Sequence, residues 1–206
     1  APENWANLPA DRIWDITQGE PVAKPFAPPA IGSGQPVTQA AQMDKASTQQ
    51  FWAKQHAAMD AMKRDRNFAK AVSLFREALA INPNHEDSHY YLANCLVELG
   101  DIPSAVGELD ALIRINPQNH RAYQRKGELL AASASSKSNL AAARRTLDAA
   151  LQLNSEETGT LVLLGEVQLA EGNLPEADRD FTHVLQANAR AANALYFRGY
   201  IAWKRH

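Results

Sequence analysis

The chain has 206 residues, 45% of them hydrophobic and 21% charged, and its net charge at pH 7 is -2. This balance is typical of a globular protein, and it gives no electrostatic reason to expect binding to nucleic acid or to an anionic membrane. Cys95 is the single cysteine of the chain. It therefore excludes an internal disulfide and a cysteine-based metal site, and we predict that it is a small buried residue.

The chain begins with Ala1 and Pro2 instead of methionine. Removal of a signal peptide after a small residue leaves this pattern. We therefore predict a periplasmic or secreted protein, with a cytoplasmic location as the alternative.

Residues 1–37 hold seven of the 11 prolines. Because proline fixes φ and lacks a backbone N–H, this region cannot form one long helix or a central strand, although a helical turn fits residues 9–14. Large apolar residues argue against a solvated linker. We predict an ordered, extended arm that packs on its own chain or on a partner, anchored by Trp5, Ile13, Trp14 and Phe26.

From about residue 38 onward the apolar spacing predicts helices, separated by turn signals such as Gly100-Asp101 and Gly172-Asn173. A polar loop that we expect to be mobile interrupts the pattern over residues 133–138. The helices are expected at about 42–64, 68–81, 86–99, 102–115, 120–134, 139–153, 158–171, 174–187 and 191–204.

Four segments of the helical region align on one another at a spacing of about 34 residues. Ala71 and Ala105 are one period apart, as are Ala143 and Ala177. A fixed period of this length is typical of stacked helix pairs that cannot bury their apolar faces alone. Such a stack presents a binding surface, so we predict that the protein is not an enzyme and needs no cofactor.

The second helix of each unit carries the same spacing of small and large residues. A small residue is followed by Phe or Leu four positions later and by another apolar residue three positions after that. The four copies are Ala71-Phe75-Ala78, Ala105-Leu109-Leu112, Ala143-Leu147-Ala150 and Ala177-Phe181-Val184. The first helices carry small residues at Ala93, Gly127 and Gly165, where two helices can approach closely.

These motifs resemble those of the tetratricopeptide repeat (TPR) family, and the resemblance covers about residues 52–206. It implies an all-α fold, a right-handed superhelix (an α-solenoid) of antiparallel helix pairs that follows the extended proline-rich arm. The domains expected are the arm, 1–37, and a TPR domain, 38–206. The repeats are expected at about 52–85, 86–119, 120–157 and 158–191, with a capping helix at 192–206.

In the TPR family the first helices line a concave groove that binds an extended peptide. Relatives that clamp a chaperone's terminal carboxylate use basic and amide side chains here, whereas Glu128 and Glu166 oppose a carboxylate. We therefore predict no carboxylate clamp, but a neutral or basic extended partner, the alternative being a solvated face. The resemblance places Asp87, Tyr90, Asn94, Glu98, Arg121, Gln124, Glu128, Val162, Glu166, Tyr196 and Tyr200 in the groove.

The last helix is aromatic, with Tyr196, Phe197, Tyr200 and Trp203. The spacing of Tyr196, Tyr200 and Trp203 places them on one face. The alternatives are packing on the preceding repeat or the arm, and contact with a partner protein.

Residues His85-Glu86-Asp87-Ser88-His89 match the HExxH pattern of zinc hydrolases, in which two histidines bind zinc and the glutamate is the general base. The repeat places His85 in a loop and His89 at the start of the next helix, so we expect structural roles and no metal. A zinc hydrolase using His85, Glu86 and His89 remains the remote alternative.

The leading functional prediction is a non-catalytic accessory or stabilising subunit of a larger exported complex, with a membrane-associated dehydrogenase as one host. Its partners would be larger protein subunits of a hetero-oligomer, without nucleic acid or a direct membrane span. The alternative is a free-standing adaptor or assembly chaperone that binds extended peptide segments.

Overall fold

The computed structural model of this protein describes residues 13–15, 22–24, 44–134 and 137–205. The chain divides into two units, Ala1–Gln42 and Met43–His206. The predicted domain boundary after residue 37 lies outside the described residues and stays a prediction.

The first unit contains a two-stranded antiparallel sheet, β1 (Ile13–Asp15) and β2 (Val22–Lys24), in which Trp14 is opposite Ala23. The helical turn expected over residues 9–14 is therefore wrong at Ile13 and Trp14. Neither strand contains a proline, so every residue keeps the N–H that pairing requires.

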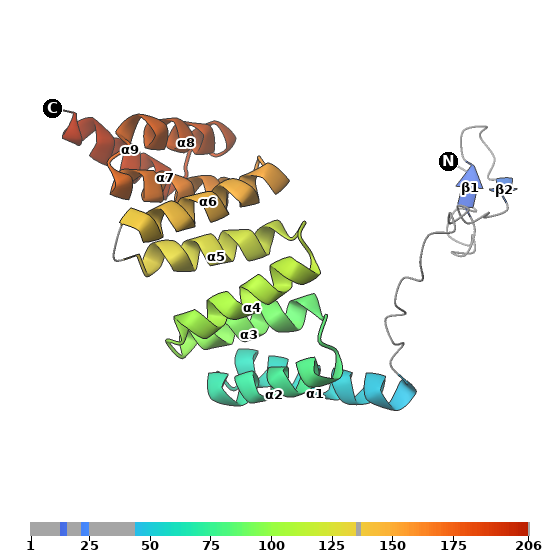
Figure 1. The fold of residues 1–206 in the computed structure, drawn as a ribbon. Coiled ribbons are helices and arrows are strands. Elements are labelled where there is room, and N and C mark those ends of the chain that lie inside the picture. Colours follow the sequence, from blue (N-terminus) through green and yellow to red (C-terminus); the bar gives the residue numbers. More distant parts are fainter. Residues whose placement is uncertain (1–12, 16–21, 25–43, 135–136, 206) are drawn as a thin grey trace. The chain divides into compact units, whose positions relative to one another are not determined.

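In the second unit, the described residues form a stack of helices that follow one another in chain order (Figure 1). The main contacts join α1 to α2, α3 to α4, α5 to α6 and α7 to α8, which are the expected helix pairs. None of these helices combines the length and hydropathy needed to cross a membrane. The helices are α1 (Lys45–Lys63), α2 (Phe68–Ile81), α3 (Glu86–Glu98), α4 (Ile102–Ile115), α5 (His120–Ala132), α6 (Lys137–Leu153), α7 (Thr158–Glu171), α8 (Leu174–Ala187) and α9 (Ala192–Lys204).

The insertion in the third repeat lies partly in a helix. We expected a polar loop over residues 133–138, but α6 begins at Lys137 and has 17 residues, whereas α4 and α8 have 14 each. The loop prediction is wrong in extent because Lys137, Ser138 and Asn139 extend α6 by about one turn.

Polar side chains fix where the helices begin. Asp44 Oδ1 accepts a hydrogen bond from the Ser47 N–H at 2.7 Å, and Asn67 Oδ1 accepts one from the Lys70 N–H at 3.0 Å. Asp101 caps α4 in the same way. Each cap satisfies an N–H that the helix leaves unpaired, and so stabilises the start of its helix.

The turn inside each of three helix pairs uses a left-handed residue. Gly100 and Gly172 take φ values of +79° and +86°. Arg66 lies one repeat period before Gly100 and takes φ +49°, the one non-glycine residue with positive φ in the described chain. The first repeat therefore makes the same turn without glycine, at a cost of about 1 kcal/mol.

The core lies where the two helices of a pair cross, and in the third and fourth pairs a glycine of the first helix faces a large side chain of the second. A Cβ at Gly127 would lie 2.6 Å from Leu147 Cδ2, and a Cβ at Gly165 would lie 2.6 Å from Phe181 Cζ. Leu147 and Phe181 have no exposed surface. The glycines thus let the large residues fill the crossing.

Candidate functional site

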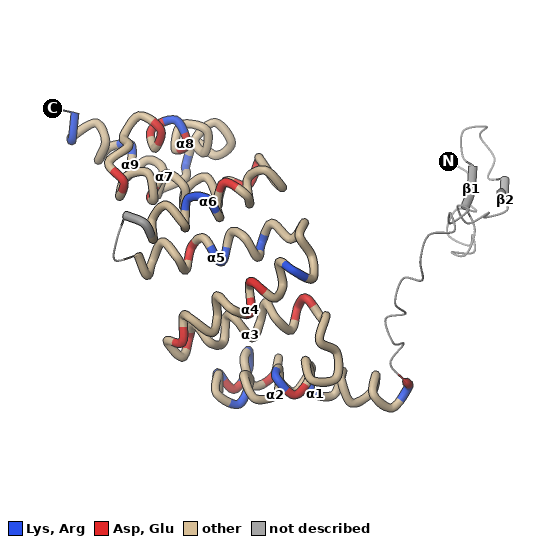
Figure 2. The backbone as a smooth tube through the Cα atoms, in the orientation of Figure 1, with Lys and Arg blue, Asp and Glu red and all other residues tan. Residues whose placement is uncertain are grey.

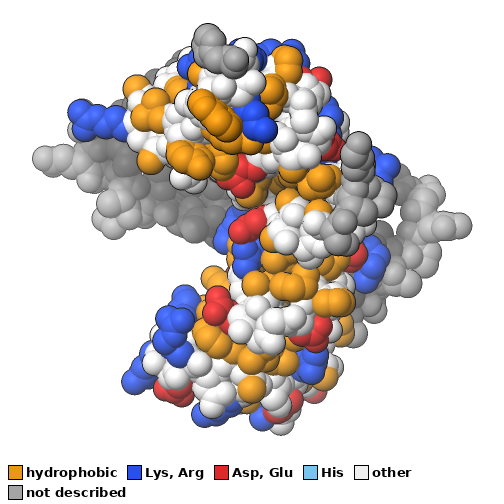
Figure 3. Space-filling model, turned by 90° about the vertical axis from the view of Figure 1, so that its left-hand side faces the viewer, with side chains coloured by type: hydrophobic (Ala, Val, Ile, Leu, Met, Phe, Trp, Pro, Cys, Tyr) orange, Lys and Arg blue, Asp and Glu red, His pale blue; other side chains and the backbone are white. Residues whose placement is uncertain are grey.

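The predicted groove residues lie on the first helices of the pairs. None of these residues is fully buried. Because α5 contacts α7 and α7 contacts α9, successive first helices form one face of the stack. The space-filling view is hollowed at mid-height, with charged side chains of both signs at its edge (Figure 3). The residues are Asp87, Tyr90, Asn94 and Glu98 on α3, Arg121, Gln124 and Glu128 on α5, Val162 and Glu166 on α7, and Tyr196 and Tyr200 on α9.

Two arginines of α5 join α5 to α3. The Arg121 guanidinium lies over the Tyr90 ring, 4.7 Å from its centroid. Arg125 Nε donates a hydrogen bond to Asn94 Oδ1 at 3.0 Å. Because Asn94 and Arg121 have these internal partners, the two residues that could have served a carboxylate clamp are already engaged.

The groove residues of α5 and α7 include two carboxylates, Glu128 and Glu166. Arg125 also forms an ion pair with Glu128, with Nη1 and Oε2 2.7 Å apart. The α5 helix carries both basic and acidic residues along its length (Figure 2). Glu166 has no hydrogen-bond donor among the described side chains. Burial, and then the negative charge of Glu128, raise the pKa of Glu166 above its usual value.

A pocket lies beside these two carboxylates. Apart from the two carboxylates, the residues that line the pocket are aliphatic, so a ligand would contact an apolar surface and two acidic groups. The residues that line it are Glu128, Ala131, Ala132, Leu140, Leu163, Glu166, Val167 and Ala170.

Known proteins match part of the sequence and the fold of the helix stack. A model of the tetratricopeptide repeat family matches residues 64–132. MamA from Desulfovibrio magneticus is 17% identical, with a TM-score of 0.68 over 76% of this chain and 85% of that chain. Residues 64–132 thus carry tetratricopeptide repeats, and the described helix stack has the fold of TPR structures. Its right-handed solenoid of antiparallel helix pairs confirms the predicted fold class.

Other TPR structures share the fold at low sequence identity. PilF of Pseudomonas aeruginosa is 21% identical, with a TM-score of 0.65 over 78% of this chain and 71% of its own. YrrB, described as a TPR protein with an unusual peptide-binding site, is 18% identical, with a TM-score of 0.64 over 75% of this chain and 76% of its own. At these identities the likeness shows the fold alone.

The curated relatives are much longer. DnaJ homolog subfamily C member 3 of Homo sapiens is 30% identical over 102 residues, which are 50% of this chain and 19% of that protein. The TPR chain thus spans about a fifth of the relatives it matches. Together the comparisons support a scaffold for protein–protein interaction.

The aromatic residues of α9 separate into two groups. Phe197 is half-buried and stacks on Phe181, with the ring centroids 5.1 Å apart. Tyr196 and Trp203 are 69% and 70% exposed, and Tyr200 is also exposed. Packing on the preceding repeat therefore holds for Phe197 and not for the other three.

The predicted arm anchors contribute no geometry to the site. Trp5 and Phe26 lie outside the described residues. Ile13 and Trp14 lie in β1, but their side chains are not among those described. Their role as anchors stays a prediction.

The HExxH residues of this TPR protein have structural partners. His85 caps α3, because its Nδ1 accepts from the Ser88 N–H at 3.2 Å. Ser88 Oγ in turn donates to Gln55 Oε1 at 2.7 Å, which links α3 to α1. Glu86 accepts from the side-chain amides of Asn116 and Asn119, both at 2.9 Å.

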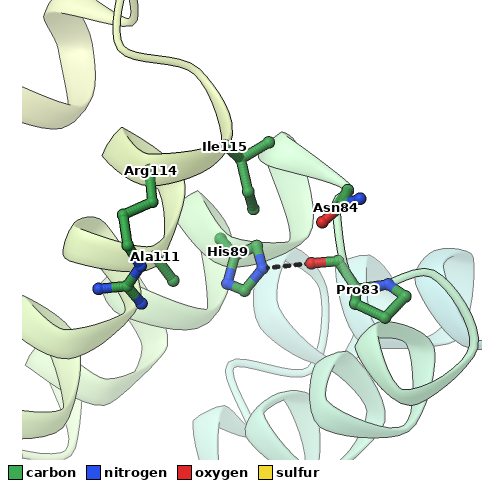
Figure 4. Close-up of a pocket in the computed structure, with 6 residues that line it drawn as sticks. All are labelled: Pro83, Asn84, His89, Ala111, Arg114 and Ile115. Atoms are coloured by element: carbon green, nitrogen blue, oxygen red, sulfur yellow. Dashed lines mark hydrogen bonds between the residues drawn. The ribbon is translucent and has the colours of Figure 1, made fainter. Parts of the chain in front are cut away.

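His89 uses both ring nitrogens. Nδ1 lies 2.7 Å from Glu108 Oε2, and Nε2 lies 2.9 Å from the Pro83 carbonyl oxygen (Figure 4). Both neighbours are acceptors, so the ring bonds to both only as an imidazolium. Burial lowers the pKa of His89, but the bonds to Glu108 and Pro83 and the charge of Glu108 outweigh it, and the pKa is raised.

Sequence reasoning missed Arg125 and the bridge from His89 to Glu108. The spacing of Arg125 was informative, since it lies four residues after Arg121 and three before Glu128, on the same helical face. No sequence signal pairs His89 with Glu108, because nineteen residues and a turn separate them.

Proposed function

We propose that this TPR scaffold binds an extended segment of a partner protein and that a basic side chain of that segment enters the pocket beside Glu128 and Glu166. The observation that carries the proposal is the half-buried carboxylate of Glu166, which no described side chain neutralises. A lysine or arginine there would form a charge-assisted hydrogen bond in a partly desolvated site.

The surrounding residues support an extended ligand. The Tyr90 ring and the aliphatic pocket wall offer contact area at low cost in side-chain entropy. Arg121 lies over Tyr90 and Arg125 bonds to Asn94 and Glu128, whereas Glu166 has no cation among the described side chains. The ligand's basic residue is therefore expected at one defined position of the segment.

The test is an array of extended peptides that differ at one central residue: arginine, lysine, glutamine or glutamate. Arginine and lysine peptides should bind, and Glu166→Gln should weaken their binding by about tenfold or more, as expected for loss of a charge-assisted bond. The matched control is Glu156→Gln, an exposed glutamate in the turn between α6 and α7 and outside the predicted groove, which should change affinity by less than about twofold. Equal binding of the glutamate peptide would refute the proposal.

We further propose that the protein acts as a non-catalytic accessory subunit of a larger exported complex, with a membrane-associated dehydrogenase as one host. Cys95 is compatible with an oxidising compartment, because burial raises the pKa of its thiol to about 11 and keeps it protonated. Native mass spectrometry of the gently purified protein and fractionation of its source cells test both points. A monomer would favour a free-standing adaptor, and a cytoplasmic location would refute export.

A further inference from the structure

A second pocket lies where α5 packs against both α4 and α6. Its volume is about 340 Å³, and residues of all three helices line it. It shares no lining residue with the pocket beside Glu128 and Glu166, and none of its lining residues is among the predicted groove residues. This second pocket, named here the α4–α6 pocket, is therefore a separate surface of the helix stack.

The α4–α6 pocket has an apolar part to which each helix contributes. Ile113 of α4, Leu130 of α5, and Ala142 and Ala149 of α6 all keep part of their surface exposed. A ligand with an apolar side chain would remove this surface from water, which favours binding. The pocket therefore suits a ligand that is larger than a hydrated ion.

Three side chains with hydrogen-bond donors line the same pocket. Lys126 Nζ lies 2.6 Å from Asp110 Oδ1, and this bond uses one of its three N–H groups. The Tyr123 hydroxyl and the Arg145 guanidinium have no hydrogen bond or ion pair with any described residue. The pocket thus offers donors that no acceptor in the described chain uses.

The positive charge of Arg145 is not balanced. Arg144, the residue before it, pairs with carboxylates of both α7 and α8, at 3.1 Å and 2.9 Å, whereas Arg145 has no carboxylate partner among the described residues. Asp110 already offsets the charge of Lys126. The lining residues therefore carry one net positive charge, which an anion complements.

We propose that the α4–α6 pocket binds an acidic side chain of a partner protein, with the carboxylate on Arg145 and an apolar neighbour against Ile113 and Leu130. A guanidinium presents two parallel N–H groups to a carboxylate, and the Tyr123 hydroxyl supplies a third donor. This surface lies outside the groove, so the inference goes beyond the proposed peptide binding. The two pockets select opposite charges, a base in the groove and an acid here.

The charge of the chain favours a single carboxylate over a polyanion. The net charge is -2, and the pocket itself carries one net positive charge, so neither provides the extended basic surface that nucleic acid requires. The apolar part of the pocket matches a protein side chain, whereas a phosphate group has no apolar surface to place there. A glutamate between two leucines therefore represents the expected ligand.

The probe is the peptide Gly-Leu-Glu-Leu-Gly, acetylated and amidated so that the glutamate carries its one charge. NMR titration of the full chain is the measurement, because it detects the weak binding expected of a short peptide. The amide signals of Tyr123, Lys126 and Arg145 should shift and saturate together. A peptide with glutamine in place of the glutamate should bind about tenfold more weakly or worse, since it keeps the shape and loses the charge.

The deciding variant is Arg145→Gln. It should weaken binding of the glutamate peptide by about tenfold or more and leave binding of the glutamine peptide within about twofold, because only the charged ligand depends on the guanidinium. The melting temperature should not change, since this exposed side chain has no partner in the described chain.

The matched control is Arg190→Gln, in the turn between α8 and α9. It removes the same charge from another exposed arginine, one that lies outside both pockets. This control should leave the affinity for the glutamate peptide within about twofold.

Four results would overturn the proposal. The glutamine peptide could bind as tightly as the glutamate peptide, or the glutamate peptide could bind Arg145→Gln as well as it binds the wild type. Arg190→Gln could weaken binding as much as Arg145→Gln, which would mean attraction to overall charge. Finally, a single-stranded oligothymidylate could bind more tightly than the glutamate peptide at physiological salt and lose that binding in Arg145→Gln, which would assign the pocket to phosphate groups.

Discussion

The fourth helix pair and the last helix carry the same sequence pattern in two different environments. Gly165 of α7 is covered by Phe181, whereas Gly199 of α9 faces open space. The pattern therefore specifies a helix that can accept a close neighbour, and the neighbour decides whether the site is core or surface. Gly165 is therefore a packing residue, whereas Gly199 is exposed.

The largest expected difference is between Phe181, in the fourth helix pair, and Trp203, in α9. Phe181→Ala should lower the free energy of unfolding by about 3–5 kcal/mol, because the side chain is fully buried and its removal leaves a cavity. Trp203→Ala should change it by less than about 0.5 kcal/mol, because the ring is 70% exposed. Urea unfolding followed by circular dichroism measures both, and equal losses would show that α9 is covered in the free protein.

The two glycines provide the next comparison. Gly165→Ala should cost about 1–3 kcal/mol, because the new Cβ would lie 2.6 Å from the Phe181 ring. Gly199→Ala should stabilise the protein by about 0.5–1 kcal/mol, since alanine is the better helix former and meets nothing. Thermal unfolding of the two variants should therefore give shifts of opposite sign, and a loss in both would contradict an open α9.

Two histidines extend the comparison to polar contacts. His89 is buried between Glu108 and Pro83, whereas His183 lies on the surface, 3.9 Å from Glu156. Since folding raises the pKa of His89, its stabilising contribution is complete below about pH 6.5 and is lost as pH rises through the raised value.

His89→Gln should therefore cost on the order of 1–2 kcal/mol at about pH 5.5, because Glu108 loses its charged partner. It should also flatten the fall in stability between about pH 6 and pH 8. His183→Gln, the surface control, should leave the curve of unfolding free energy against pH close to that of the wild type. An unchanged curve in His89→Gln would mean that the ring is neutral.

The smallest expected effect concerns the first and second turns of the stack. Arg66→Gly should stabilise the protein by about 0.5–1 kcal/mol, because glycine adopts positive φ without the steric cost that arginine meets at +49°. Gly100→Ala should destabilise it by a similar amount at φ +79°. A loss of stability in Arg66→Gly would show that the Arg66 side chain contributes more than its backbone strain costs.

Much of the fold could be predicted because the decisive signals are local. The bounds of α2, α4, α7 and α8 agree with the expected ranges, since capping residues and turn glycines mark many of their ends. The prediction failed where the local sequence fits both a loop and a helix. Residues 133–138 are polar enough for a loop, but Lys137 and Ser138 already belong to α6.

The candidate site was predictable only in outline. The repeat spacing placed Asn94, Glu128 and Glu166 on the first helices, and the structure brings them to one face. The side chains that contact these residues could not be predicted from the repeat spacing. Arg125 lies 31 residues from Asn94, and the contact depends on how α5 is rotated against α3.

The sequence by itself determined the helices, their pairing and the residues that each helix offers to its neighbours, because period, caps and glycine positions act within about one repeat. Only the tertiary structure decided that Glu166 has no cation among the described side chains, that His89 is held between two acceptors and that Gly199 is uncovered. These properties depend on distances between helices that lie a repeat apart, and such distances are set by packing angles that no local pattern encodes.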